Sequence, residues 1–234
     1  MTPVSYDIEL TGVYKSYPLG KSRIPIFEDL TMTIPDGDFL AIMGPSGSGK
    51  STILNLIGGI DTVDGGHVSI GGTMLDKMST RALTRWRSEV IGFVFQFYNL
   101  MPMLSAAQNV ELPLLLTDLS ASERRERVHT ILDIVGLADR HDHLPSLLSG
   151  GQQQRVGIAR AIASDPRILL CDEPTGDLDR KSADEILELL QLLNTKLGKT
   201  IIMVTHDESS TRVAKRTVIL DKGRFVSEEI AQCA

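Results

Sequence analysis

The segment Gly44–Thr52, with the sequence GPSGSGKST, constrains the fold of this chain more than any other feature. It follows the apolar run Phe39–Met43, which reads as a buried strand, and it precedes helix-like residues up to about Ile57. The glycines allow the backbone to curl until successive N–H groups converge on one point, and the helix that follows adds the positive end of its dipole. A strand–loop–helix unit of this form, G-x-x-x-x-G-K-[ST], is therefore predicted to bind phosphate groups.

The side chains of this loop also have expected roles. Lys50 supplies a compact positive charge for β- and γ-phosphates, and the hydroxyl of Ser51 can be a ligand of Mg²⁺. The alternative is a Gly/Ser-rich turn that fits the pattern by chance, and the strand before the loop and the helix after it argue against that. The predicted phosphate-binding residues are Gly44, Pro45, Ser46, Gly47, Ser48, Gly49, Lys50, Ser51 and Thr52.

Composition narrows the class of protein. The 234 residues carry 24 Lys and Arg against 30 Asp and Glu, a formal net charge of -6, and 42% of them are hydrophobic. These values are ordinary for a folded globular chain, and the acidic balance argues against nucleic acid as a partner, which needs a clustered basic surface. Cys171 and Cys233 lie too far apart in sequence to indicate a disulfide framework. The segment Met1–Asp7 lacks the pattern of a secretory signal, which predicts a cytoplasmic protein.

Buried runs alternate with helical patterns along the chain. Short apolar runs at Ile91–Phe95, Ile168–Cys171 and Ile201–Val204 are typical of strands in a parallel sheet. Helices are predicted between them, and one opens with the capping-box pattern Ser120–Glu123. The alternation predicts an α/β fold with a mainly parallel sheet. The helix-rich stretch from about 100 to 160 is interpreted as an inserted subdomain.

Two further polar motifs accompany these runs. Asp172 and Glu173 close the run Ile168–Cys171. Asp172 could reach Mg²⁺ if its strand lay beside the one that feeds the phosphate loop, and Glu173 could then polarise a water for in-line attack. A strand end that merely faces solvent is the alternative. The segment Leu148–Arg155, LSGGQQQR, precedes another helix and offers a second anion site at the helix start.

These motifs together resemble those of ATP-binding-cassette ATPases over essentially the whole chain. The Leu-Ser-Gly-Gly-Gln element is close to diagnostic of that family. The motifs occur in the family's order: the phosphate loop Gly44–Thr52, Gln96, the signature Leu148–Gln152, the pair Asp172–Glu173, the segment Gly176–Asp179, and His206.

The resemblance implies a fold and a domain organisation. The expected fold is an α/β P-loop NTPase core with a mainly parallel sheet, an N-terminal antiparallel β part and an inserted α-helical subdomain. The whole chain, 1–234, would form one nucleotide-binding domain. Its catalytic core would cover about 1–96 and 160–234, and its helical subdomain about 97–159.

The resemblance also implies that two copies of the chain enclose two ATP molecules with Mg²⁺. Tyr17 would stack on adenine, with Tyr14 as a second candidate, and an ordinary strand aromatic is the alternative interpretation of Tyr17. The signature residues of one copy would cap the γ-phosphate held by the other copy. They are Ser149, Gly150 and Gly151, with Gln152 beside them among the nucleotide-binding residues.

The remaining motif residues receive roles in the same way. Gln96 would sense Mg²⁺ and the attacking water, and Glu173 would be the general base. His206 would contact the γ-phosphate as a switch, and Asp179 would lie on the loop that communicates between the two sites. The implied ligands of Mg²⁺ are Ser51, Gln96 and Asp172.

One uncharged stretch, residues 90–110, is long enough to span a bilayer, but polar residues and Pro102 interrupt it, so a transmembrane helix is rejected. In the family this region receives an integral membrane permease, and we expect Phe97–Leu104 to dock such a partner. The alternative is that these side chains fill the subdomain core. The chain would then sit peripherally on the cytoplasmic face of the inner membrane.

The subgroup that Phe93–Leu100 and Asn109–Leu114 most resemble is the lipoprotein-release and macrolide-efflux type, although Asp177 stands where Asn is commoner. It implies export or mechanotransmission across the bacterial cell envelope. A cassette that regulates an envelope or division machine without transport stays an alternative. Non-transport cassettes of chromosome maintenance or translation are disfavoured, because the former split their motifs with long coiled coils and the latter usually carry two cassettes.

Overall fold

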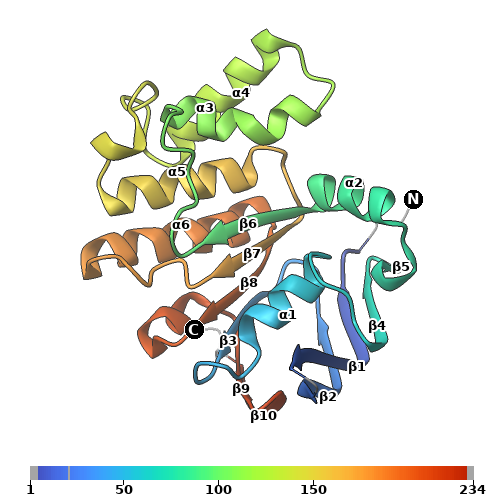
Figure 1. The fold of residues 1–234 in the computed structure, drawn as a ribbon. Helices are drawn as coiled ribbons and strands as arrows, with labels where there is room; N and C mark the ends of the chain where they lie inside the picture. Colours follow the sequence, from blue (N-terminus) through green and yellow to red (C-terminus); the bar gives the residue numbers. More distant parts are fainter. Residues whose placement is uncertain (1–4, 21, 231–234) are drawn as a thin grey trace.

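The computed structural model describes residues 5–20 and 22–230 (Figure 1). Cys233 and the start of the segment Met1–Asp7 lie outside this part of the chain, and so do the sequence expectations placed on them. The strands are β1 (Ile8–Leu19), β2 (Ser22–Ile34), β3 (Phe39–Met43), β4 (Gly65–Ile70), β5 (Thr73–Met74), β6 (Ile91–Phe95), β7 (Ile168–Asp172), β8 (Thr200–Thr205), β9 (Arg216–Asp221) and β10 (Arg224–Ile230). The helices are α1 (Lys50–Ile57), α2 (Thr80–Val90), α3 (Ala106–Glu111), α4 (Ala121–Ile134), α5 (Gly150–Ile162) and α6 (Arg180–Leu197). Short 3-10 turns cover Leu75–Lys77, Leu112–Leu116, Pro145–Leu147 and Glu208–Val213.

The main sheet has the strand order β10-β9-β3-β8-β7-β6. The pairs β3–β8, β3–β9, β7–β8 and β6–β7 are parallel, and β10 pairs with β9 in the antiparallel sense. Both faces of β3, β7 and β8 are buried, which is why their sequences are continuous apolar runs instead of alternating ones.

A second, antiparallel sheet with the order β2-β1-β4-β5 comes from the N-terminal part of the chain. Strand β1 buries Ile8, Leu10 and Val13 and exposes most residues between them, the alternation expected of a sheet with one covered face. The α/β class, the mainly parallel sheet and the N-terminal antiparallel part predicted from the sequence are confirmed.

Alternate residues of the main sheet face two separate cores. In β3, Phe39 and Ala41 join a core formed with α3, α4, α5 and α6. Leu40 and Ile42 join the other core, formed with α1 and the antiparallel sheet. The sheet is thus a middle layer, with α1 on one face and α5 and α6 on the other (Figure 1). This separation decides where the two glycine-rich helix starts lie.

The inserted helical region is built around α3 and α4, which pack on α5. Helix α4 begins as the sequence predicts, because Ser120 and Glu123 form a complete capping box. Helix α5 runs past position 159 to Ile162 and packs on both α3 and β6. The division of the chain at about 97 and 159 therefore stays a prediction.

The uncharged stretch 90–110 is not a single helix. It contains the end of α2, all of β6, a loop and most of α3. Within residues 5–20 and 22–230, none of the helices has both the length and the apolar character needed to cross a membrane.

Candidate functional site

The loop between β3 and α1 is shaped by close backbone approaches. A Cβ on Gly44 would lie 2.1 Å from the carbonyl oxygen of Leu220, so only glycine fits there. Gly49 precedes α1 in a left-handed conformation, φ 106°, and packs against the ring of Phe27 on β2. The antiparallel sheet thus braces the loop from one side.

The polar groups of this loop fit a phosphate ligand. Lys50 is buried, and its Nζ donates to the carbonyl oxygens of Gly44 at 2.7 Å and Pro45 at 3.0 Å. The Oγ of Ser48 is buried as well and finds no hydrogen-bond partner among the described residues. Leaving a buried hydroxyl unpaired costs about 1–3 kcal/mol. A phosphate oxygen that accepted from Ser48 would remove that cost.

A candidate cation site lies beside the loop, where the Oγ of Ser51 is 3.3 Å from Oδ1 of Asp172. From the sequence, Asp172 is expected to reach this place on the condition that β7 lies beside β3, but β8 lies between the two strands. Asp172 reaches Ser51 because α1 packs across both β7 and β8. In the described part of the chain, no group of three or more His, Cys, Asp or Glu side chains is placed to hold a metal ion. The pair of Ser51 and Asp172 suits Mg²⁺, which keeps several waters and takes its other ligands from phosphates.

Burial raises the pKa of the Asp172 carboxyl, and the charge of Glu173 adds to this, while the hydrogen bond from Ser51 opposes it. Burial makes the charged form of this carboxyl less favourable than it would be in water. A bound cation would reverse that preference, so the donor set fits a divalent metal.

Glu173 and His206 face each other across the ends of β7 and β8. The Nδ1 of His206 lies 2.7 Å from Oε2 of Glu173. The backbone of Glu173 has φ 46°, which is uncommon for a residue with a side chain, and its N–H donates to the carbonyl of Val204 at 3.0 Å. A cavity of about 480 Å³ opens beside this pair and the start of α6. The contact with His206 and the backbone hydrogen bond hold the Glu173 carboxylate in one position, which suits a group that accepts a proton.

Gln96 follows β6 at the same edge of the sheet. Phe95 pairs with Asp172 in parallel register, so Gln96 comes directly after that pair. Its side chain lies against Gly176, where an added Cβ would be 3.1 Å from Nε2. The structure thus gathers Gln96, Glu173 and Gly176 at the carboxyl ends of the strands.

The signature segment lies on the other side of the sheet. Ser149 caps α5, and its Oγ accepts from the N–H of Gln152 while Oε1 of Gln152 accepts from the N–H of Ser149. Gly150 and Gly151 allow close packing, since Cβ atoms there would lie 2.9 Å from the Tyr98 and Ser182 hydroxyls. In the described part of the chain no hydrogen bond joins Ser149–Gln152 to the phosphate loop.

Asp179, expected on a communicating loop, is the N-cap of α6. Its carboxylate accepts from the backbone N–H of Ser182 at 3.0 Å and from the Ser182 hydroxyl at 2.6 Å. These hydrogen bonds lower the pKa of Asp179. Because Ser182 also packs against Gly151, the cap of α6 lies next to the start of α5.

Two polar residues of α5 that sequence reasoning missed hold the strand ends. Gln154 is fully buried, and its Nε2 donates to the carbonyls of Phe95 at 3.2 Å and Pro174 at 2.6 Å. Arg160 donates to the carbonyls of Tyr98 and Asn99, both in left-handed conformations. The signal available in the sequence is the position of Gln154, four residues before Ile158 on the apolar face of the helix.

The segment predicted to dock a partner is divided. Phe97 and Met103 are 71% and 70% exposed. Leu100, by contrast, packs against the core. The buried side chain of Asn109 holds the loop by hydrogen bonds to Met101, Leu104 and Ser105. Phe97 and Met103 are therefore available to a partner, as one interpretation expects, whereas Leu100 fills the core, as the other expects.

Tyr17 lies at the end of β1, and its Oη donates to Oδ2 of Asp61 at 2.6 Å. Burial raises the pKa of Tyr17, and Asp61 raises it further. Tyr17 is thus tied to the connection that follows α1. Tyr14, the second candidate, is 49% exposed and lies farther back on β1.

Comparison with known proteins places these features in a family. A family model described as ABC transporter matches residues 27–176. An uncharacterized ABC transporter ATP-binding protein, YvrO of Bacillus subtilis, is 48% identical over 95% of this chain and 96% of its own length. The macrolide export ATP-binding/permease protein MacB of Burkholderia pseudomallei is 42% identical over 95% of this chain, which spans only 34% of MacB.

A solved structure is similar along nearly the whole chain. It is a dimeric post-hydrolysis state of the ATP-binding cassette MJ0796, from Methanocaldococcus jannaschii, bound to ADP and Pi. The TM-score is 0.89 at 42% identity, covering 97% of this chain and 100% of the other.

Proposed function

Because this chain belongs to the ABC transporter family of ATPases, we propose that it binds ATP with Mg²⁺ at Gly44–Thr52, dimerises around two ATP molecules and drives a separate membrane permease by hydrolysing them. The one observation that carries this proposal is the position of the two glycine-rich helix starts, on opposite faces of the main sheet. A chain built in this way needs a second copy to bring a signature to its own phosphate loop.

The residues at the strand ends supply the chemistry of hydrolysis. Glu173 accepts the proton of the attacking water, and His206 holds that carboxylate through the 2.7 Å contact. Lys50 turns from the carbonyls of Gly44 and Pro45 to the phosphate oxygens. Mg²⁺, held by Ser51 and Asp172 with Gln96 nearby, would neutralise charge on the β- and γ-phosphates.

Completion of the site across the dimer gives the proposal its energetic reason. Phosphoryl transfer depends mainly on positioning and charge stabilisation, and a donor supplied by a second molecule is worth about 10³–10⁵ in rate. In this role the start of α5, Ser149–Gln152, acts on ATP bound by the partner. The dimeric MJ0796 cassette with ADP and Pi supports the arrangement.

The dependence on dimerisation is directly measurable. ATP turnover per chain should fall as the protein is diluted to a concentration at which sedimentation shows only monomer. Undiminished turnover by a strictly monomeric chain would refute the two-copy site.

The permease partner is proposed to bind at the exposed apolar side chains Phe97, Met103 and Leu116, which are 71%, 70% and 81% exposed. Large exposed apolar side chains of this kind are typical of an interface. MacB, which is named a macrolide export ATP-binding/permease protein, supports a membrane partner and a role in export, with mechanotransmission as the alternative. The chain would lie on the cytoplasmic face of the inner membrane.

Membrane fractionation tests this second part of the proposal. Replacing Phe97, Met103 and Leu116 together by Asp should move the chain from the membrane fraction to the soluble one without loss of ATP binding. Leu192→Asp, on the exposed side of α6, is the control and should keep membrane association. Equal membrane association of both variants would contradict the assigned surface.

A further inference from the structure

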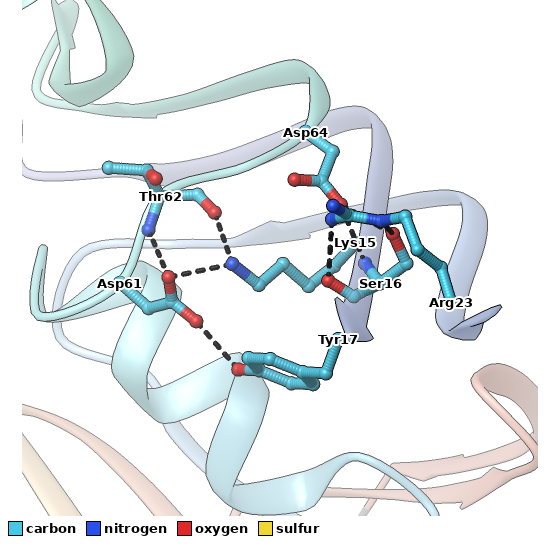
Figure 2. Close-up of polar contacts among 7 residues, drawn as sticks. All are labelled: Lys15, Ser16, Tyr17, Arg23, Asp61, Thr62 and Asp64. Carbon is cyan, nitrogen blue, oxygen red and sulfur yellow. Dashed lines mark hydrogen bonds and ion pairs between the residues drawn. The ribbon is translucent and has the colours of Figure 1, made fainter. Parts of the chain in front are cut away.

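The phenol of Tyr17 is held by Asp61, which is distant in sequence, and the neighbouring Lys15 is bound to the same carboxylate (Figure 2). Lys15, on the same strand, is only 6% exposed. Its Nζ donates to Oδ1 of Asp61 at 2.6 Å and to the carbonyl of Thr62 at 2.7 Å. A buried ammonium keeps its charge only where such partners replace water.

Asp61 joins the lysine to the tyrosine. One carboxylate oxygen, Oδ1, takes the ammonium of Lys15 and the backbone N–H of Thr62, and the other, Oδ2, takes the phenol of Tyr17. Burial opposes the charge on Asp61, but the hydrogen bonds from Lys15 and Tyr17 outweigh it and lower the pKa of this carboxyl. The Asp61 carboxylate is therefore charged at neutral pH, which makes its Oδ2 a strong acceptor for the Tyr17 hydroxyl.

The two faces of the Tyr17 ring differ. The Nζ of Lys15 lies over one face, 4.9 Å from the ring centroid, within the range of a cation–π contact. The side chain remains 36% exposed. The cation thus occupies one face of the ring, and the side chain as a whole stays partly accessible.

A second carboxylate fixes the strand that carries the ring. Asp64 accepts from the N–H and hydroxyl of Ser16, and from Arg23 on β2 at 2.9 Å. Asp61 and Asp64 both belong to the short connection between α1 and β4. The connection that leaves the phosphate-loop helix is therefore bound to β1 through both carboxylates, of which only Asp61 accepts from the Tyr17 hydroxyl (Figure 2).

We propose that Asp61 and Lys15 are positioning residues for nucleotide-base recognition, which hold the partly exposed Tyr17 ring in place for adenine before ATP arrives. The inference rests on the proposed function, and specifically on Tyr17 as the residue that stacks on the base. Ordering a side chain in advance removes a cost that binding would otherwise carry.

The test compares ATP with inorganic tripolyphosphate, which has the phosphates but no base, by calorimetry on the full chain. Asp61→Ala and Tyr17→Phe should each weaken ATP binding about three- to tenfold, the expected effect of ordering one side chain, with tripolyphosphate binding unchanged. The double variant should be no weaker than Asp61→Ala alone, because both changes break one contact. Asp165→Asn, which removes the carboxylate charge paired with the buried Lys199 outside the Tyr17 group, is the control and should keep the parent affinity for ATP.

The outcomes separate this inference from the proposed function. If Tyr17→Ala leaves the ratio of ATP to tripolyphosphate affinity unchanged, Tyr17 does not stack on the base, and both ideas fail at that residue. If Tyr17→Ala lowers the ratio but Asp61→Ala and Tyr17→Phe do not, only the positioning role is overturned. A purely structural ion pair would lower thermal stability in Asp61→Ala without changing the ratio. Should Asp61→Ala not fold, Tyr17→Phe decides the matter, because it removes only the hydroxyl.

Discussion

Two helices of this chain begin at glycine-rich segments, and they begin differently. Helix α1 follows Gly49, which has no side chain, and no side-chain cap covers its first N–H groups within the described residues. Helix α5 begins with a complete capping box between Ser149 and Gln152. The first start is open to the phosphate that we propose the chain binds, with Lys50 and the Ser48 hydroxyl, unpaired among the described residues, in place. The second start is capped by its own side chains, and Ser149 is exposed.

The capping box itself is not what makes the second start special. Ser105 with Gln108 on α3, and Ser120 with Glu123 on α4, form the same arrangement. What distinguishes α5 is the pair Gly150 and Gly151, at which side chains would meet Tyr98 and Ser182. A matched set of variants can therefore separate helix capping from a role in catalysis.

The largest effect is expected from Ser149→Asp. Aspartate caps a helix as well as serine does, so α5 should stay folded, but the added negative charge would face the γ-phosphate held by the partner. ATP turnover should fall by about 10³-fold or more, the low end of what a donor from a second molecule contributes. Ser105→Asp, the same change in the capping box of α3, should leave turnover as it is. Equal losses in both variants would point to a general folding effect.

Glu173→Gln should produce the next largest loss. The amide keeps the size of the side chain but cannot take a proton, so turnover should drop about 10²–10⁴-fold. ATP binding should persist, and the chain should accumulate as an ATP-bound dimer in size-exclusion chromatography. Hydrolysis near the parent rate would show that another group is the base.

A smaller effect, on stability, is expected from Gln154→Leu. The change removes the donors to the Phe95 and Pro174 carbonyls in a buried place, and an unpaired buried group costs about 1–3 kcal/mol. Urea denaturation measures the difference in unfolding free energy. Gln191→Leu, on an exposed position of α6, is the control and should stay within about 0.5 kcal/mol of the parent.

The smallest effect concerns the cap of α6. The hydrogen bonds from Ser182 lower the pKa of Asp179, so the ionised carboxylate stabilises the fold above the unfolded value of about 3.9. That contribution is lost as the pH falls through the lowered pKa of the folded state. Asp179→Asn should therefore show a shallower loss of unfolding free energy between neutral and acidic pH. An unchanged slope would mean that the cap does not depend on the charge.

Much of the fold follows from local patterns. The buried runs of β3, β7 and β8 and the capping box at Ser120 are visible in the sequence because each depends on near neighbours. The lateral order of strands is not, and so the position of β8 between β3 and β7 could not be read.

The site divides in the same way. The phosphate loop is a contiguous motif and needs no knowledge of the fold, whereas Lys15 and Asp61 are brought together only by the pairing of β1 with β4. The uncharged stretch after Gln96 could not be sorted into exposed and buried side chains, because its backbone is held in a loop by hydrogen bonds to the buried Asn109 side chain, which no local pattern indicates.

One mixing experiment tests the two-copy site most directly. Lys50→Ala should destroy the phosphate loop of a chain that keeps its signature, and Ser149→Asp should destroy the signature of a chain that keeps its loop. Each variant alone should be inactive, but a mixture should regain part of the ATP turnover, with a maximum at equal amounts, because the mixed dimer holds one intact loop opposite one intact signature. No recovery at any ratio, with mixed dimers shown to form, would contradict the account.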